Sequence, residues 1–139
     1  MIVLDTNVIS ELFRPAPDRR VLYWVEAQEA DELFTTSVTE AEMFSGIGFM
    51  AAGRRRSDLF SATEAYFRSD LAGRILSFDS AAARSYAEIT AIRKRKGLSI
   101  SAFDMQIAAI ARTCNAVLAT RNTKDFEFTG VQIVNPWLG

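Results

Sequence analysis

Acidic residues are the side chains of this sequence best suited to chemistry, because histidine is absent and cysteine is scarce. The 139 residues include no histidine and one cysteine, Cys114. Ser-His-Asp and Cys-His catalysis, histidine general bases and histidine metal ligands are therefore excluded. Any reaction centre must come from Asp, Glu, Ser, Thr, Lys, Arg or Tyr. We expect Cys114 to be an inert core residue, since it lies in an apolar stretch and cannot form an internal disulfide.

Three acids occupy positions from which an α/β fold could bring them together. Asp5 directly follows residues 1–4, an apolar run that predicts a buried strand. Glu42 and Asp104 lie near the starts of two predicted helices, at the edge of the apolar stripe of each. Strand ends and helix starts gather at one edge of such a sheet, where the ligand crevice lies. We therefore expect the three carboxylates to converge.

A divalent cation would reconcile these acids with one another. Converging carboxylates without a cation repel and raise each other's pKa. Oxygen ligands without His or Cys favour Mg²⁺ or Mn²⁺. A structural role is the other interpretation, because Thr39 with Glu42, and Ser101 with Asp104, match the spacing of a helix cap and its partner acid, and Asp5 could itself be a cap. The residues alone leave both interpretations open.

The rest of the sequence predicts alternating strands and helices. The predicted strands are residues 1–4, 32–36, 74–78, 116–120 and 131–134, and the predicted helices are residues 6–13, 18–28, 39–51, 57–71, 80–96 and 101–113. This alternation indicates an α/β fold with a mainly parallel sheet that helices cover on both faces. The helices at 39–51 and 57–71 are expected to form a hairpin.

Length and composition are typical of one globular domain. Apolar residues make up 49% of the chain and charged residues 24%, the ordinary balance. We expect one domain over residues 1–139. No apolar run approaches the roughly 20 residues that span a bilayer, and the short apolar start does not predict a signal peptide. A cytoplasmic protein without a membrane partner is expected.

Two basic runs could contact nucleic acid. The net charge is −1, so such contact depends on local patches rather than on the total. The runs are Arg54–Arg56 and Arg93–Lys96. Either could follow an RNA backbone, or it could be solvated surface charge and, for the second run, a favourable helix C-terminus.

The predicted hairpin carries more apolar residues than one face of a surface helix needs. These residues are Met43, Phe44, Ile47, Phe49 and Met50 in the first helix, and Phe60, Tyr66 and Phe67 in the second. The excess predicts either contact with a partner or a deeply buried hairpin.

The sequence resembles PIN-domain ribonucleases in four motifs that occur in the family's order. They are Leu4-Asp5-Thr6-Asn7, then Thr39-x-x-Glu42 with Gly46, then Asp104, then Thr120-Arg121-Asn122 with Asp125-Phe126. The ending Val134-Asn135-Pro136-Trp137 is similar to VapC-type toxins of bacterial toxin–antitoxin pairs. Each motif alone is weakly specific, whereas the ordered set covers essentially the whole chain.

The resemblance implies a PIN-like three-layer α/β/α fold with a mainly parallel sheet and a protruding helical hairpin. It implies a Mg²⁺- or Mn²⁺-dependent endoribonuclease in which the metal activates water to hydrolyse an RNA phosphodiester bond. The implied partners are RNA, a second copy of the chain in a homodimer, and a cognate antitoxin that blocks the acidic site. DNA would be contacted only indirectly, through the antitoxin.

By this resemblance Asp5, Glu42 and Asp104 are the catalytic, metal-binding acids. Many relatives have an aspartate at the position of Asn122, whose amide oxygen can bind metal but carries no charge. Asp125 could supply that charge or be structural.

Three more residues are assigned to the substrate side of the site by the resemblance. Thr6 and Asn7 would orient Asp5 or a water molecule, or cap the helix. Arg121 would hold a substrate phosphate or be an ordinary surface arginine.

Two rival functions remain. A catalytically silent RNA- or protein-binding module on the same fold is favoured by Asn122. A phospho-acceptor protein would need an acceptor Asp and a Lys at strand ends, and Lys124 is its only, poor, candidate.

Overall fold

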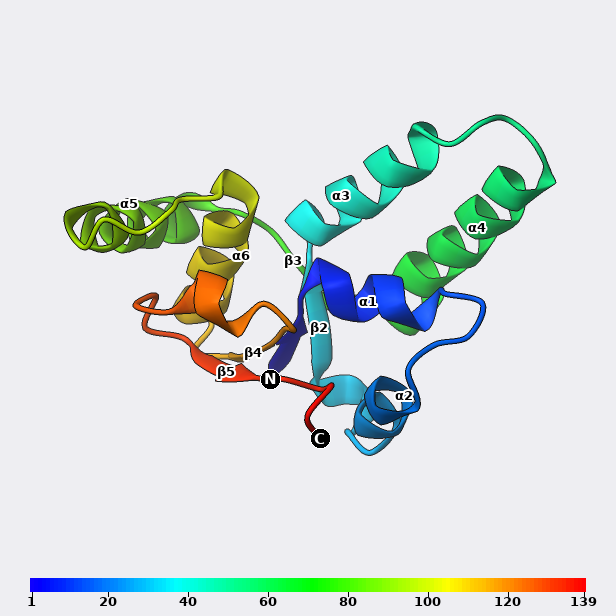
Figure 1. Ribbon diagram of the computed structural model, residues 1–139, viewed down its shortest axis with the longest axis horizontal. Helices are drawn as coiled ribbons and strands as arrows, with labels where there is room; N and C mark the ends of the chain where they lie inside the picture. The colour runs from blue at the N-terminus through cyan, green and yellow to red at the C-terminus, as the bar shows by residue number, and fades with distance from the viewer.

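Five short strands form one parallel sheet through the middle of the molecule (Figure 1). The computed structural model describes all residues, 1–139. The strands are β1 (Ile2–Leu4), β2 (Leu33–Thr36), β3 (Ile75–Leu76), β4 (Val117–Ala119) and β5 (Gln132–Val134). They lie in the order β3-β2-β1-β4-β5, and every neighbouring pair is parallel. The α/β class predicted from the sequence is confirmed.

Six α-helices connect and cover the strands. They are α1 (Thr6–Leu12), α2 (Arg19–Glu26), α3 (Ser37–Gly48), α4 (Arg54–Ala65), α5 (Ser80–Arg95) and α6 (Ala102–Thr113). Three short helices of other types add to them: the 3-10 helices η1 (Ala30–Glu32) and η3 (Thr123–Phe126), and the π-helix η2 (Tyr66–Asp70). The helices η1 and η3 were not expected, whereas η2 extends α4 within the predicted helix 57–71.

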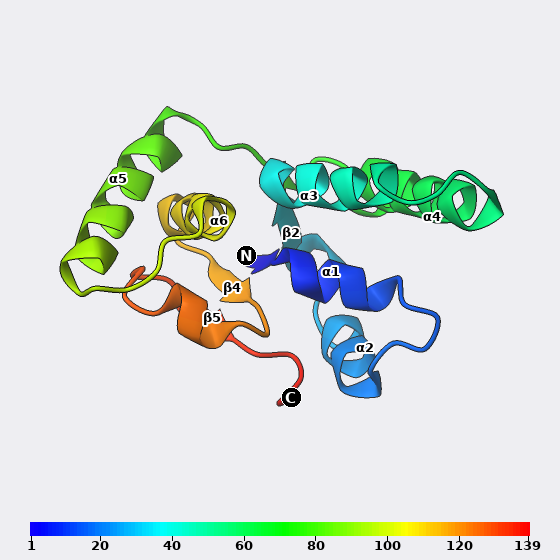
Figure 2. The ribbon, with the colours of Figure 1, turned by 45° about the horizontal axis from the view of Figure 1, so that its top comes forward.

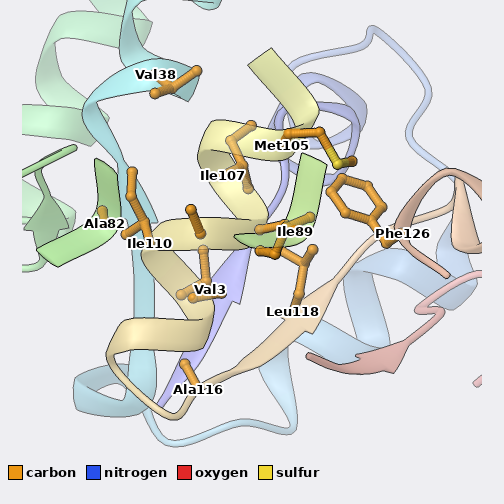
Figure 3. Close-up of a cluster of buried hydrophobic side chains, with 13 residues drawn as sticks. Val3, Val38, Ala82, Ile89, Met105, Ile107, Ile110, Ala116, Leu118 and Phe126 are labelled. Atoms are coloured by element: carbon orange, nitrogen blue, oxygen red, sulfur yellow. The ribbon is translucent and has the colours of Figure 1, made fainter. Parts of the chain in front are cut away.

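The two faces of the sheet bury two separate apolar clusters. Side chains alternate along a strand, so Val3 and Leu118 contact α5 and α6, while Leu4 and Ala119 contact the α1 and α2 side. Figure 3 shows the first cluster, in which Phe126 packs near Met105. Helices on both sides of the sheet give the predicted three layers.

The helices α3 and α4 form an antiparallel hairpin that projects away from the sheet (Figures 1 and 2). Its base is buried, with Val38 7% and Phe67 2% exposed. Toward the tip Ile47 is also buried, whereas Phe49 is 88% and Phe60 47% exposed. Deep burial is therefore confirmed for part of the hairpin, and contact with a partner stays a prediction for its exposed apolar side chains.

The start of α3 differs from the sequence expectation. The helix begins at Ser37, because the Thr36 hydroxyl at the end of β2 accepts a hydrogen bond from the Thr39 amide at 3.1 Å. Thr39 is therefore inside the helix, and the expectation that it caps a helix carrying Glu42 in its first turn is wrong. The corresponding expectation for Ser101 is correct, since its hydroxyl accepts from the Asp104 amide at 3.4 Å.

Cys114 is exposed, so the expectation of a core position is wrong. The helix α6 ends at Thr113, and Cys114 with Asn115 forms the surface turn that leads to β4. Asn115 has a positive φ of 52° in that turn, a conformation that asparagine tolerates better than most residues. No helix of the chain has both the length and the apolar character needed to cross a membrane.

Candidate active site

The connectivity of the sheet places its switch point between β1 and β4. From β1 the chain proceeds to β2 and β3 on one side, and it later returns to add β4 and β5 on the other. In open α/β sheets a ligand crevice forms at such a point, outside the carboxyl ends of the strands. Asp5 follows β1, and Thr120 follows β4.

A cleft of about 440 Å³ opens at this point. It is lined by Asp5, Thr6, Asn7, Ser10, Glu11, Arg14, Glu42, Asp104, Arg121, Asn122 and Trp137. All three acids of the sequence hypothesis are among these residues, as are four of the five other residues named there. Asp125 is the exception, because it lines a neighbouring depression that shares Arg121 and Asn122 with the cleft.

Asp5 is the most tightly held of the acids. Its carboxylate is nearly inaccessible, since the residue is 3% exposed. Oδ1 accepts a hydrogen bond from the Thr6 amide at 2.8 Å. Oδ2 accepts from the Thr120 hydroxyl at 2.7 Å and from Asn7 Nδ2 at 3.2 Å. Oδ2 thus uses both of its lone pairs, whereas Oδ1 keeps one for another ligand.

The environment of Asp5 and Asp104 disfavours their negative charge. Burial raises the pKa of Asp5 to about 6; hydrogen bonds from Thr120 and Thr6 oppose this rise, and the charges of Asp104 and Glu42 add to it. The pKa of Asp104 is also raised, by burial and then by the charges of Asp125 and Glu42. The acids therefore lie within each other's field, which is the repulsion expected from the sequence.

Thr6 orients Glu42 through its side chain. Its hydroxyl donates to Glu42 Oε1 at 2.8 Å, and it lies 3.0 Å from the Thr39 hydroxyl, so the single proton of Thr6 is accounted for if Thr39 donates to it. Thr6 also contacts Asp5, but only through its backbone amide. The sequence hypothesis linked Thr6 to Asp5 and did not foresee its bond to Glu42.

Asn7 ties the first acid to the segment after β4. Its Nδ2 lies 3.2 Å from both Asp5 Oδ2 and the Thr120 hydroxyl, and its Oδ1 accepts from the Arg121 amide at 3.2 Å. The Thr120 hydroxyl in turn accepts from the Asn122 amide at 3.1 Å. One network therefore fixes Asp5 relative to Arg121 and Asn122.

The chemistry of the cleft fits a hydrated divalent cation. No group of three acidic side chains is close enough to bind a single ion directly. Mg²⁺, however, usually keeps several water ligands and needs only one or two protein carboxylates. A buried carboxylate with a raised pKa, facing two more acids across a cleft that has room for water, meets that requirement. The donors are all oxygen atoms, as Mg²⁺ and Mn²⁺ prefer.

Two arginines share the cleft with the acids. Arg14 forms an ion pair with buried Glu11 at 3.3 Å. Arg121 is exposed, and its guanidinium lies over the indole of Trp137.

Arg93 is not available to RNA, because it is 2% exposed and donates to the carbonyls of Ser99 and Glu127. Only Lys94–Lys96 of the second basic run remains accessible.

Several residues of the site were missed by sequence reasoning. Ser10, Glu11 and Arg14 were not singled out at all, and Thr39, Thr120 and Trp137 belong to the quoted motifs but were given no role in the site. Thr120 could have been found from strand order, since Leu4 pairs with Ala119 and the next residues, Asp5 and Thr120, are therefore neighbours. Trp137 belongs to the terminal motif of the resemblance, but its place at the cleft could not be predicted, because only the folded chain brings the C-terminal segment there.

The chain is similar to known proteins over nearly its whole length. A family model described as the PIN domain matches residues 2–130. The chain is 46% identical to VapC ribonuclease Y4jK of Sinorhizobium fredii, covering 99% of this chain and 98% of that protein. It is 38% identical to toxin FitB of Neisseria gonorrhoeae, covering 99% of each.

The fold is similar to a solved complex. The structure of FitAB bound to an IR36 DNA fragment includes a chain that superposes with a TM-score of 0.93 at 39% identity, covering 99% of this chain and 96% of that one.

Proposed function

The chain belongs to the PIN-domain family, and on that premise we propose that it is a metal-dependent endoribonuclease, the toxin of a bacterial type II toxin–antitoxin pair. The single observation that carries this proposal is the cleft that brings Asp5, Glu42 and Asp104 together at the carboxyl ends of β1 and β4. Relatives named as a VapC ribonuclease and a toxin, similar over the full length, support the same activity.

Asp5, Glu42 and Asp104 hold the cation in this proposal, directly or through its water ligands. Mg²⁺ or Mn²⁺, when bound, supplies Lewis acidity that lowers the pKa of water and offsets charge on the phosphate. Asn122 also lines the cleft. Its side chain makes no hydrogen bond to the protein, so its amide oxygen is free to bind the cation. Asp125 lies beside the cleft, and its negative charge acts on Asp104, whose pKa it helps to raise.

The remaining cleft residues orient the acids and the RNA. Thr6 holds Glu42, and Asn7 and Thr120 hold Asp5, so the carboxylates are set before substrate arrives. Arg121 holds a phosphate of the RNA backbone, because its guanidinium has donors free in the cleft. Water is the nucleophile in this proposal, so no protein nucleophile is needed, which agrees with the absence of histidine.

The antitoxin and a second copy of the chain are the proposed protein partners. This chain is similar to one chain of the FitAB complex bound to DNA. We therefore infer that a cognate antitoxin binds this chain and that contact with DNA is indirect, through the antitoxin. The exposed part of the hairpin supports a protein contact, since a pocket of about 450 Å³ between α3 and α4 combines the apolar side chains of Phe44 and Phe60 with the basic side chain of Arg56.

Two further parts of the proposal concern the whole chain. Residues 1–139 form one PIN-like domain, which is supported by a single sheet with an apolar cluster on each face. The protein acts in the cytoplasm, which is where the RNA substrate of such a toxin is found.

A catalytically silent RNA- or protein-binding module is the second candidate function. It is favoured by Asn122, which replaces the charged residue of many relatives, and by the lack of three acids around one point.

RNA cleavage by single-residue variants tests the proposal. We expect Asp5→Asn and Asp104→Asn each to lower the rate of cleavage of a labelled single-stranded RNA in Mg²⁺ by about 100-fold or more. The exposed Asp58 of α4, outside the cleft, provides the matched control Asp58→Asn, which should cleave normally. Cleavage that survives either cleft substitution, or that proceeds in EDTA, would overturn the proposal.

A further inference from the structure

Arg121 and Trp137 form a stacked pair at the rim of the acidic cleft. The Arg121 Cζ atom lies 5.1 Å from the centroid of the Trp137 ring, and both residues line the cleft. A guanidinium within about 6 Å of an indole face is attracted to it. The two side chains come from different segments, since Arg121 follows β4 and Trp137 follows β5.

Trp137 is a rigid support for this contact. Its residue is 4% exposed and belongs to the apolar cluster that contains Leu4 and Ala119. Its amide donates to Asn135 Oδ1 at 2.9 Å, which fixes the local turn. The indole therefore has a fixed position, and the Arg121 side chain adopts the conformation that places its guanidinium on the indole face.

The Arg121 guanidinium has no other partner within the protein. It forms no ion pair, and none of its side-chain nitrogens donates a hydrogen bond. Its backbone amide is held by Asn7 Oδ1 at 3.2 Å. The charge of Arg121 reaches Asp18, whose pKa it helps to lower after the stronger effect of Arg20. The stack thus competes with attraction to nearby carboxylates.

We infer that Trp137 is a positioning residue, which holds the Arg121 guanidinium at the cleft so that its free donors meet a phosphate of the RNA. The inference rests on the proposed function, because it takes RNA as the substrate. Its physical basis is electrostatic. A cleft of carboxylates repels a phosphate, and a cation fixed beside them offsets that repulsion, whereas a mobile arginine would spend part of its time elsewhere.

RNA binding in the cleavage-silent Asp5→Asn background tests the inference. Binding of a dye-labelled single-stranded RNA is measured by fluorescence anisotropy. Arg121→Gln should weaken binding about 10-fold through loss of the phosphate contact, and Trp137→Leu about 3- to 10-fold through loss of the stack. Trp137→Phe retains an aromatic face and should remain within about threefold of the parent.

The double variant separates positioning from a merely structural role. If Trp137 acts through Arg121, Trp137→Leu combined with Arg121→Gln binds no more weakly than Arg121→Gln alone. If Trp137 only supports the fold, the two losses multiply, and Trp137→Phe gives no specific rescue. Multiplied losses would overturn the inference.

Tryptophan fluorescence tests the stack without RNA. The chain has two tryptophans, so Trp24→Phe leaves Trp137 as the only one. In that protein Arg121→Gln should change the emission of Trp137, whereas Lys124→Gln, the same charge change in the same segment, should not. Unchanged emission in Arg121→Gln contradicts the stack, even if Trp137→Leu fails to fold. Absence of RNA binding in every variant, with the emission change present, would instead count against the proposed function.

Discussion

Asp5 combines strong hydrogen bonding with a location that opposes its charge. Two side chains and one backbone amide donate to its carboxylate, yet burial raises its pKa to about 6. Without a cation the ionised carboxylate is therefore a cost to the fold. A site that destabilises its own empty state in this way is suited to binding a cation, which relieves the cost.

The stability of the metal-free protein should consequently fall as pH rises from about 4 to 7. The folded-state pKa of Asp5, about 6, is above the ordinary value of 3.8, so the unfolded chain loses this proton first and is favoured as pH increases. The full penalty, about 3 kcal/mol at ~1.4 kcal/mol per pKa unit, is present above pH 6 and absent below pH 3.8.

Asp5→Asn removes this titration. In EDTA, the unfolding free energy of the variant relative to the parent should increase by about 3 kcal/mol between pH 4 and pH 7.5, as measured by urea denaturation at each pH. A constant difference across that range would show that Asp5 carries no destabilising buried charge.

Among single residues, the sequence predicts acids better than their supports. Asp5 was identifiable because it ends an apolar run at the start of the chain, and Asp104 because Ser101 marks a helix start. The supporting roles of Thr120 and Trp137 depend on which strands are neighbours and where the last segment lies, and a single sequence carries no signal for these tertiary relations.

Among the elements, every predicted strand and helix is present, and the errors concern boundaries. The helix α3 begins earlier than expected, because Thr36 both ends β2 and caps the helix, so no loop separates the two. The capping pair, Thr36 and Thr39, has no acid at the third position after the cap, whereas the Thr39-x-x-Glu42 pattern that follows does. Cys114 was misplaced for a similar reason, since its apolar neighbours belong to β4 and not to the turn.

Arg93 holds two elements together, and its loss should be destabilising. The buried guanidinium joins the carbonyl of Ser99, before α6, to that of Glu127, after η3. Arg93→Met leaves those carbonyls without their donor and should reduce the free energy of unfolding by about 2–4 kcal/mol. The neighbouring exposed Lys94 gives the control Lys94→Met, expected within about 0.5 kcal/mol of the parent. Equal stability of the two variants in chemical denaturation would refute this role.

Across the whole molecule, the sheet and its two helix layers hold the cleft in place, and the α3–α4 hairpin projects beyond them (Figure 2). Phe49, at the end of α3, is 88% exposed, so it contributes little to the fold and can be replaced without a loss of stability.

If the hairpin tip lies in an interface, Phe49→Glu places a charge there and should weaken the homodimer or the antitoxin complex by about 10-fold or more. The thermal unfolding temperature should not change, because Phe49 is exposed. Light scattering after size exclusion measures the mass of the free chain and of its complex with the co-expressed antitoxin. Tyr23→Glu is the matched control, because Tyr23 is a 63% exposed aromatic on α2. If neither mass changes in Phe49→Glu at any protein concentration, the hairpin tip contributes neither to a homodimer nor to the antitoxin complex.

Metal dependence of the acidic cleft is tested by a calorimetric titration of Mg²⁺ into the metal-free protein at pH 7.5, beside the same titration of Asp5→Asn. We expect binding to the parent, accompanied by a rise in the unfolding temperature through mass action, and neither effect in the variant. A parent protein that binds RNA but shows no Mg²⁺ or Mn²⁺ binding, or a variant that binds the cation as well as the parent, would contradict the metal-dependent nuclease and favour the silent binding module.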